Sequence, residues 1–402
     1  MEMYRRTFAE INLDHLKHNI QVLQKAFPQT PFLCPMVKAN AYGHGDVQLA
    51  RFLETLGIKH LGVCLIEEGL LLRRSGVSAE ILVFRGFDRE GAEKIIEYNM
   101  TPVVSSWEQI DHLEAVASDP VGIHLKFDTG MNRLGFRPEE AQKLFDRLWQ
   151  NKKIRLKALV THLFNGEDAT DAQGLSARQL RDLNRVSTVF KPFNIFCHAL
   201  NSAGIMSALQ MKDAGNTPGD HPLFLQNWGL RPGLMIYGYN PLGAKNFGGL
   251  KPVMSLKSHV ATYRNLHIGE TVSYGGTWTA KQESVIAVVP IGYADGYHRI
   301  LSNQSSVVFA GKRVPLVGNI CMDYLMLDVT EVVRGKDLKD FKDQEVTLFG
   351  CASDGSFLSP EELAVQAKSI TWEMLTSVGE RVPRIYSGVD VGFVFDESRG
   401  QR

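Results

Sequence analysis

The sequence predicts an α/β protein in which an N-terminal (β/α)8 barrel is followed by a mainly β C-terminal domain. Short apolar runs alternate with amphipathic stretches, and eight such runs occur before residue 240. That number and spacing are typical of a (β/α)8 barrel, with a doubly wound open sheet as the alternative. No GxGxxG follows the first run, which favours the barrel. Near residue 245 the pattern changes to β-like runs with few helical stretches, which predicts the second domain.

The first helix is expected after Asp14, a plausible N-cap, because Leu16, Ile20, Leu23 and Phe27 recur on one helical face. The eight strands of the barrel are expected at 32–37, 60–66, 80–84, 101–104, 122–127, 156–161, 195–199 and 231–237. Helical patterns separate most of these strands, for example at 46–56, 138–149 and 176–190.

A segment rich in turn-forming residues, NPLGAKNFGG at 240–249, predicts the linker between the domains. We therefore place the barrel at 12–242 and the β domain at 1–11 and 243–402, because an opening strand at 5–11 could pair with the second domain. Further strands are expected at 253–264, 270–274, 284–290, 306–309, 313–317, 324–329 and 345–350, and short helices at 360–366 and 371–377.

The composition excludes several classes of function. Lysine plus arginine and aspartate plus glutamate both number 44, so no bulk charge attracts nucleic acid or an anionic membrane. The first ten residues contain no apolar core of a signal peptide, and no apolar stretch of about 20 residues could span a bilayer. The five scattered cysteines lack a metal-binding spacing and indicate reduced thiols in a cytoplasmic protein. We expect no metal site.

Lys38 is the most informative residue, because it ends the first apolar run in LCPMVKANAYGHG (33–45) and a glycine-containing loop follows it. An amine at the C-terminal end of a barrel strand points into the mouth of the fold. Reduced hydration there favours the neutral amine, which is the nucleophile that forms a Schiff base. The alternative is a structural lysine at a strand end that only extends its ammonium group to solvent.

Other polar residues also follow predicted strands. Lys126 with Asp128, His162, Asn201 with Ser202, and Arg231 all lie at or next to strand ends. In a barrel these ends share the face on which the loops build the active site. Any one of these residues could be an ordinary loop residue, but together they predict one pocket.

Eight motifs resemble those of the alanine racemase family, which uses pyridoxal phosphate (PLP), and they cover essentially the whole chain. They are AEINLDHLKHNI (9–20), VKANAYGHG (37–45), HLKFDTGMNRLGF (124–136), HALNSAGI (198–205), LRPGLMIYG (230–238), VSYGGTWTA (272–280), IGYADGYHR (291–299) and GNICMDYLMLDVT (318–330). The resemblance implies a PLP-binding barrel, L-alanine and D-alanine as substrates, and a head-to-tail homodimer with active sites between subunits.

Several cofactor contacts follow from the resemblance. Lys38 matches the lysine that holds PLP as a Schiff base, and Tyr42 resembles a phosphate contact, although a tyrosine that only packs in the loop is the alternative. Ser202, Gly233 and Leu234 match positions whose hydroxyl and backbone N–H groups bind the phosphate, a task for which such donors are suited. The role of Asn201 at the same strand end is open.

Arg231 matches the arginine that meets the pyridine nitrogen of PLP, and His162 matches a residue beside the cofactor ring. An arginine can only donate a hydrogen bond, so the ring nitrogen stays unprotonated. The cofactor is then a weaker electron sink, which favours prompt reprotonation at Cα over transamination. An arginine paired with a carboxylate, and a structural histidine, are the alternatives.

The substrate contacts and the two bases also follow from the resemblance. Arg133 matches the arginine that reaches the PLP phenolic oxygen and the substrate carboxylate, and Lys126 matches a position that is often carbamylated. Lys38 is the base on one face of the substrate. Tyr274 from the partner subunit resembles the base on the other face. Met322 of the partner resembles a backbone N–H ligand of the carboxylate, in a loop that Asp323 orients.

The entrance to the site departs from the common family pattern. Trp372 in SITWE stands in place of a tyrosine that touches the phosphate and the entrance, and Asn319 in GNICMD stands where arginine is frequent. Tyr293 and Arg299 of the entrance gate are retained. Relaxed specificity that includes serine is therefore possible. The metabolic role, D-alanine supply for peptidoglycan or alanine catabolism, is open.

Three other functions are alternatives for a chain of this pattern. A PLP decarboxylase of basic amino acids has a barrel and a β domain, but it needs a carboxylate at the ring nitrogen and a cysteine nucleophile, whereas this chain has Arg231 and Tyr274. A non-catalytic PLP carrier lacks the second domain. The third alternative is a barrel enzyme without a cofactor, which would be colourless after purification, whereas a protein with bound PLP is yellow.

Overall fold

The computed structural model describes residues 4–215, 219–242 and 249–388. Part of the predicted linker, 243–248, and both ends of the predicted second domain, 1–3 and 389–402, lie outside these residues. The described chain divides into two compact units, one of 16–41, 46–215, 219–242 and 249–251, the other of 4–15, 42–45 and 252–388. Within the described ranges, no helix has both the length and the apolar composition needed to cross a membrane.

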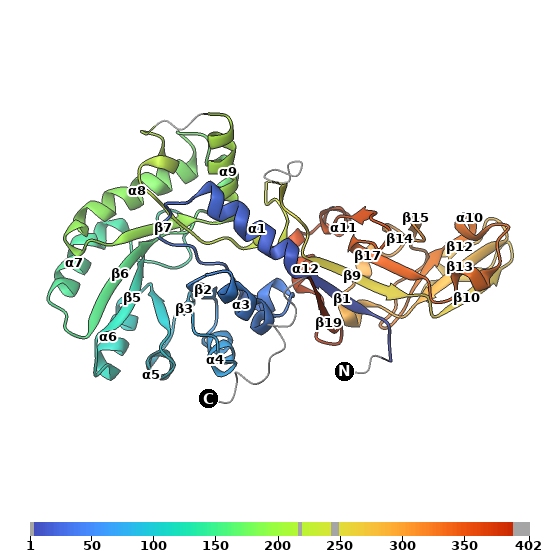
Figure 1. Ribbon diagram of the computed structural model, residues 1–402, viewed down its shortest axis with the longest axis horizontal. Helices are drawn as coiled ribbons and strands as arrows, with labels where there is room; N and C mark the ends of the chain where they lie inside the picture. Colours follow the sequence, from blue (N-terminus) through green and yellow to red (C-terminus); the bar gives the residue numbers. More distant parts are fainter. Residues whose placement is uncertain (1–3, 216–218, 243–248, 389–402) are drawn as a thin grey trace. The chain divides into compact units, whose positions relative to one another are not determined.

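The first unit is built on a ring of parallel strands (Figure 1). Seven strands pair in chain order: β2 (His60–Val63), β3 (Glu80–Val83), β4 (Thr101–Val104), β5 (Val121–Lys126), β6 (Ile154–Val160), β7 (Phe196–Leu200) and β8 (Gly229–Leu230). The segment 32–37 lies between the two end strands, because Leu33 bridges Leu230 and Met36 bridges Gly62. This eighth segment closes the ring and leaves no open edge, so the predicted (β/α)8 barrel is confirmed.

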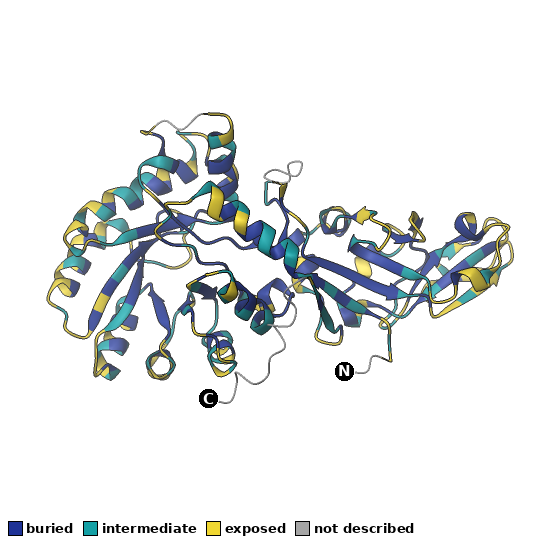
Figure 2. Cartoon of the chain, in the orientation of Figure 1, coloured by how far each residue is buried: buried dark blue, intermediate teal, exposed yellow. Residues whose placement is uncertain are grey.

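The helices of this unit lie on the outer side of the strands, as Figure 1 shows for α4 to α8. They are α1 (Leu13–Ala26), α3 (Asp46–Thr55), α4 (Ile66–Arg74), α5 (Arg89–Glu97), α6 (Trp107–Val116), α7 (Ala141–Trp149), α8 (Leu175–Val189) and α9 (Ser202–Asp213). The short segment α2 (Lys38–Tyr42) has left-handed backbone angles and is not one of them. Figure 2 shows strands that are mostly buried and helices with an exposed outer face. That pattern explains why the strands read as unbroken apolar runs and the helices as amphipathic.

The strand predicted at 231–237 is wrong. The strand is β8, which contains only Gly229 and Leu230, and Leu234–Tyr237 forms a 3₁₀ helix, η5. Pro232 has no N–H group to donate to a ladder, which ends the strand there. All four residues of η5 are buried, and a short buried helix shows the same unbroken apolar run as a buried strand. Arg231 consequently follows a strand instead of starting one.

The second unit contains the remaining strands of the described chain. They are β1 (Phe8–Asn12), β9 (Met254–His259), β10 (Thr262–Leu266), β11 (Thr271–Val272), β12 (Trp278–Thr279), β13 (Ser284–Val289), β14 (Ser306–Phe309), β15 (Lys312–Pro315), β16 (Leu325–Asp328), β17 (Glu345–Cys351), β18 (Phe357–Leu358) and β19 (Arg384–Ser387). Its helices are α10 (Thr330–Val333), α11 (Pro360–Gln366) and α12 (Thr371–Thr376). The predicted β character of the C-terminal part is confirmed.

These strands form a seven-stranded sheet in the order β15-β14-β17-β9-β1-β19, with β18 paired to β17, a three-stranded sheet β10-β13-β16, and the pair β11-β12. The opening strand β1 lies inside the largest sheet. It pairs antiparallel with β9 and parallel with β19, so the predicted pairing of this strand with the second domain is confirmed.

Candidate active site

Five residues of the predicted site lie at the C-terminal ends of the barrel strands. Lys126 is the last residue of β5, and His162 comes two residues after β6. Asn201 follows β7 directly, and Arg231 follows β8 directly. Lys38 follows the segment that closes the ring. These ends share one face of a barrel, so the side chains belong to one site.

The chain after half-buried Lys38 forms a left-handed turn. Residues 39–42 all have φ between 51° and 53°. This conformation costs about 1–2 kcal/mol per non-glycine residue, so surrounding contacts have to hold it. One such contact is the Glu68 carboxylate, which accepts the Ala39 N–H at 2.7 Å. The turn therefore fixes where the chain leaves Lys38.

The N-terminus of α9 offers donors to an anion. Asn201 caps the helix, with its side-chain oxygen accepting the N–H of the third helical residue at 3.0 Å. The Ser202 hydroxyl oxygen accepts the Gly233 N–H at 2.9 Å, which leaves the hydroxyl proton to be donated elsewhere. Among the described residues, the N–H groups of Ser202, Ala203 and Leu234 have no hydrogen-bond acceptor. Such donors at a helix N-terminus suit a phosphate.

Arg231 is 4% exposed and is held almost entirely by its two terminal nitrogens. Nη1 donates to His198 Nδ1 and to the His198 carbonyl, both at 2.8 Å. Nη2 donates to the Thr161 carbonyl at 2.7 Å and also approaches Ala199 and His162. Within the described chain, the Nε–H group has no acceptor. Burial lowers the pKa of Arg231 to about 10, so the guanidinium remains charged at neutral pH.

Two buried histidines extend from Arg231 into the barrel. Because arginine cannot accept a hydrogen bond, His198 Nδ1 is the acceptor and His198 Nε2 carries the proton. Nε2 then donates to Nδ1 of His124 at 2.8 Å. Burial lowers the pKa of His124 to about 3 and that of His198 well below its ordinary value, with Arg231 adding to both shifts. Both rings are neutral, so their hydrogen bonds keep one direction.

His162 shows which predicted residues the barrel brings together. Its pKa lies well below the ordinary value, first because of burial and then because of the positive charges of Arg231, Lys126, Arg133 and Lys38. The positive charges of four side chains therefore act on one neutral imidazole. The arrangement attracts anionic groups, which a phosphate and a carboxylate both are.

Lys126 and Arg133 are less constrained. Lys126 is 7% exposed, and burial, followed by the charges of Arg133 and Arg231, lowers its pKa to about 8. Arg133 is exposed, and its guanidinium makes no hydrogen bond or ion pair within the described ranges. Its backbone N–H donates to Asp128 at 3.1 Å, which fixes the loop but not the side chain.

The second unit carries the other predicted residues on neighbouring loops. Tyr274 begins the 3₁₀ turn η7 (Tyr274–Gly276) and is 72% exposed, and Met322 is also exposed. The Asn319 side chain donates to the Tyr274 carbonyl at 2.7 Å. The Tyr293 N–H donates to the carbonyl next to Met322, that of Cys321, at 3.1 Å. The structure thus joins the loops of Tyr274, Asn319, Met322 and Tyr293 within this unit.

Four further predicted residues lie in the second unit. Asp323 accepts a hydrogen bond from Arg381 at 2.7 Å. Arg299 is exposed at the start of η9 (Arg299–Leu301), Trp372 is half-buried in α12, and Tyr42 is buried at the end of the left-handed turn.

Sequence reasoning missed His198, His124 and Glu68. The first two lie inside predicted strands, where a buried histidine needs a polar partner, and that need was the available signal. Glu68 gave no signal, because it resembles any charged residue in the first turn of a helix.

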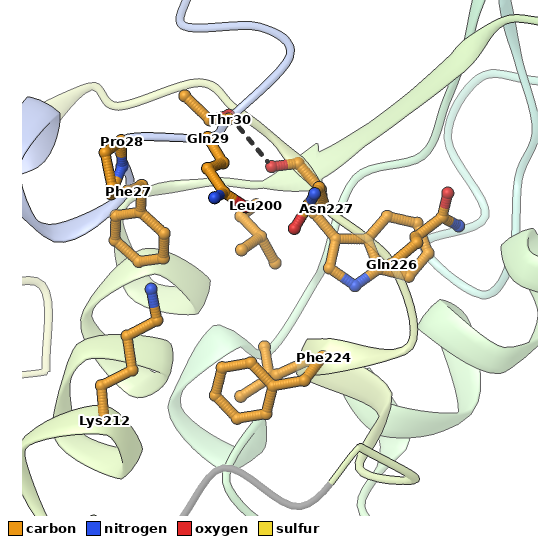
Figure 3. Close-up of a pocket in the computed structure, with 11 residues that line it drawn as sticks. Phe27, Pro28, Gln29, Thr30, Leu200, Lys212, Phe224, Gln226 and Asn227 are labelled. Carbon is orange, nitrogen blue, oxygen red and sulfur yellow. Dashed lines mark hydrogen bonds between the residues drawn. The ribbon is translucent and has the colours of Figure 1, made fainter.

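A cavity of about 240 Å³ lies outside this site, between the end of α1 and α9 (Figure 3). Lys212 points into it beside Phe27, with its ammonium group 4.0 Å from the ring centre. The same ammonium donates to the carbonyl of Ala26, the last residue of α1, at 2.8 Å. Lys212 therefore caps α1, and the cavity contains no predicted site residue.

Comparisons with known proteins agree with this geometry. The sequence model of the alanine racemase N-terminal domain matches residues 11–241, and that of the C-terminal domain matches 253–386. Alanine racemase of Sorangium cellulosum is 38% identical over 398 residues, which cover 95% of this chain and 99% of that protein. The Geobacter sulfurreducens enzyme is 35% identical over 95% of this chain and 97% of its own length.

Solved structures are also similar. Alanine racemase of Clostridium difficile 630 has a TM-score of 0.83 at 30% identity and covers 96% of this chain and 97% of its own. The Bartonella henselae enzyme, described with covalently bound pyridoxal phosphate, has a TM-score of 0.80 at 28% identity over 95% and 99% of the two chains. Two domain matches and full-length relatives above 30% identity show that this chain is a member of the alanine racemase family of PLP-dependent isomerases.

Proposed function

We propose that the protein interconverts L-alanine and D-alanine with pyridoxal phosphate as its cofactor. The observation that carries the proposal is the set of groups on one face of the barrel: the Lys38 amine, the donors at the start of α9, and the Arg231 guanidinium. An aldehyde, a phosphate and a ring nitrogen are the three groups of PLP that need such partners.

The donor set fits the cofactor. Lys38 would hold it covalently, and the Ser202 hydroxyl with the N–H groups of Ser202, Ala203 and Leu234 would bind its phosphate. The Gly233 N–H, which donates to Ser202, would orient that hydroxyl. Tyr42 and Trp372 would complete the phosphate site, and His162 would lie beside the ring. When bound, PLP supplies a conjugated ring that accepts the negative charge developing at the substrate Cα.

Arg231 would set the strength of that electron sink. Its Nη groups are held by carbonyls and by His198, and its Nε–H is left to donate to the ring nitrogen. A donor there keeps the nitrogen unprotonated. We infer that this favours return of the proton to Cα over transamination.

Racemisation needs proton transfer on both faces of the substrate Cα. Lys38 would serve one face, and Tyr274 of the partner subunit the other, in a homodimer with shared active sites. The exposure of Tyr274 and Met322 in the single chain supports this proposal, because residues that enter a partner's site are open before assembly. The Met322 N–H of the partner would bind the substrate carboxylate, with Asp323 orienting its loop.

Arg133 would bind the substrate carboxylate from the barrel side, since a guanidinium can hold a carboxylate with two hydrogen bonds. Its unattached side chain needs a partner to hold it in place. We propose that a carbamate on Lys126 is that partner, because the unmodified ammonium repels Arg133.

The entrance would be formed by Tyr293, Arg299, Asn319 and Trp372. A tryptophan in α12, at the position where the family usually has tyrosine, supports a relaxed preference that admits serine besides alanine. The product D-alanine suits peptidoglycan synthesis, and the reverse direction suits alanine catabolism. We propose a cytoplasmic location for either role.

The first test is racemisation of the purified protein with each amino acid, starting with L-alanine and D-alanine. We expect a yellow protein that racemises alanine from both directions. Lys38→Ala should lose both the absorbance of the bound cofactor and racemisation, whereas Lys59→Ala, at an exposed lysine, should keep both. Full activity of Lys38→Ala with bound PLP would refute the assignment of the cofactor lysine.

A further inference from the structure

The backbone around Tyr274 is strained. Ser273, a non-glycine residue, has φ of +65°, whereas Gly275 and Gly276 adopt φ of +75° and +53° without strain. The Ser273 conformation persists only when neighbouring contacts hold it. Tyr274 itself is 72% exposed, and among the described residues its hydroxyl group has no hydrogen-bond partner. The direction of its side chain therefore depends on what holds its backbone.

Two hydrogen bonds in opposite directions connect Asn319 to Ser273 and Tyr274. The Ser273 hydroxyl donates to the Asn319 carbonyl at 2.6 Å, and the Asn319 side-chain amide donates to the Tyr274 carbonyl at 2.7 Å. The pair fixes the side chain of the strained residue Ser273 and the peptide group that follows Tyr274. A side chain without an N–H donor at position 319 removes the second bond and leaves a backbone carbonyl without its partner.

Gly318 and Asn303 strengthen the same junction. A Cβ at Gly318 would lie 2.8 Å from the Val272 carbonyl oxygen, so only glycine permits this close approach. Asn303 accepts the Gly318 N–H at 2.6 Å and donates to Thr277 at 3.0 Å. The loop 273–277 is thus attached to the loop 316–320 directly at Ser273 and Tyr274, and through Asn303 at Thr277. A rotation of either loop moves the phenol, which lies at the far end of the tyrosine side chain.

We infer that Asn319 is a positioning residue for Tyr274: it aims the phenol by binding the tyrosine's backbone, and it does not only shape the entrance. The inference rests on the proposed function, in which Tyr274 is the base on one face of the substrate. A misplacement of about 1 Å can lower a proton-transfer rate about 100-fold. Asn319 is well suited to prevent one, because its amide reaches the carbonyl of the base itself.

The test separates the two faces of the substrate. In D2O, alanine whose Cα–H faces Lys38 can exchange that hydrogen and return to the same enantiomer, whereas inversion also needs Tyr274. Asn319→Asp keeps the shape of the side chain but cannot donate. For the enantiomer whose Cα–H faces Lys38, we expect hydrogen exchange with retention to persist while inversion falls about tenfold or more. For the enantiomer whose Cα–H faces Tyr274, hydrogen exchange and inversion should fall together. Tyr274→Phe identifies which enantiomer is which.

Controls distinguish this result from a general loss of structure. Asn265→Asp is the same change at an exposed position of β10. It should alter none of the four rates, which are hydrogen exchange and inversion for each of the two enantiomers. Ser273→Ala removes the opposing bond and should reproduce the pattern of Asn319→Asp even if that variant folds poorly. Amide hydrogen exchange of residues 271–279, measured on cofactor-free protein, should accelerate in both variants and not in Asn265→Asp.

Two outcomes would overturn different claims. If Tyr274→Phe shows the asymmetric pattern but Asn319→Asp and Ser273→Ala lower all four rates equally or not at all, the positioning role is refuted. If Tyr274→Phe itself lowers all four rates equally, Tyr274 is not the base of one face, and that part of the proposed function fails.

Discussion

Lys126 provides a prediction whose magnitude follows from the structure. Burial and the charges of Arg133 and Arg231 lower its pKa from 10.5 to about 8. At pH 7 about one tenth of such a lysine is neutral, roughly 300 times the neutral fraction of an ordinary lysine. The neutral amine attacks CO2, a C–N bond forms, and the amine loses a proton to give an anionic carbamate. We therefore expect Lys126 to be carbamylated in bicarbonate buffer.

The unmodified lysine should destabilise the fold. Its folded pKa lies below its unfolded pKa, so the unfolded chain binds more protons between pH 8 and 10.5 and stability rises with pH across that window. Below about pH 8 the penalty is fully present and amounts to ~3 kcal/mol, because the pKa falls from 10.5 to about 8 and each tenfold change in proton affinity corresponds to ~1.4 kcal/mol. Lys126→Met removes this penalty. Carbamylation also removes it and replaces repulsion of Arg133 and Arg231 by attraction.

The assay compares melting temperatures of wild type and Lys126→Met at pH 7 to 9.5. Without CO2, wild type should melt below the variant at pH 7, and the gap should narrow as pH rises above about 8. Bicarbonate should raise the melting temperature of wild type alone, and native mass spectrometry should show the added CO2. Lys59→Met, at an exposed lysine, serves as the control. Identical melting of wild type and Lys126→Met at pH 7, with no effect of bicarbonate, would refute the reasoning.

Three further outcomes are expected. Arg231→Glu should lower racemisation and raise the ratio of transamination to racemisation, because a carboxylate keeps the cofactor ring nitrogen protonated; an unchanged ratio would contradict the electron-sink argument. Serine should be racemised, since a pocket limited by shape discriminates one small group by only about 1–3 kcal/mol; turnover below about a thousandth of that of alanine would count against a relaxed entrance at Trp372. Mixed dimers of Lys38→Ala and Tyr274→Phe should recover roughly a quarter of wild-type activity, because half of the randomly reassociated dimers are mixed and each has one intact site; no recovery after verified subunit exchange would place both bases in one chain.

The barrel could be predicted from the sequence because the barrel strands are buried on both faces and appear in the sequence as separate apolar runs. The positions of Lys38, Lys126 and His162 at strand ends followed from the same pattern, since a polar residue that interrupts such a run marks the end of the strand. The pairing of the opening strand could also be predicted, because a strand before the first helix has no place in the ring.

Other features depend on contacts that periodicity does not reveal. The run at 231–237 is apolar throughout, and only Pro232 indicated that its ladder would end. The left-handed turn at 39–42 contains alanine and tyrosine, which seldom adopt positive φ, so local preferences pointed away from it. The hydrogen bond between His124 and His198 joins residues 74 positions apart, and only the closed barrel brings them together.

The position of β1 in its sheet has a consequence for synthesis of the protein on the ribosome. Ala9 pairs with Arg384, and Ile11 pairs with Tyr386 as well as with Met254. At about 5–20 residues per second, β1 emerges roughly 20–75 s before β19. Throughout that time one of the first strands made presents an open edge, which can pair with other nascent chains. Loss of the last described strand would make this exposure permanent, so truncated products of this chain should aggregate even though their barrel is complete.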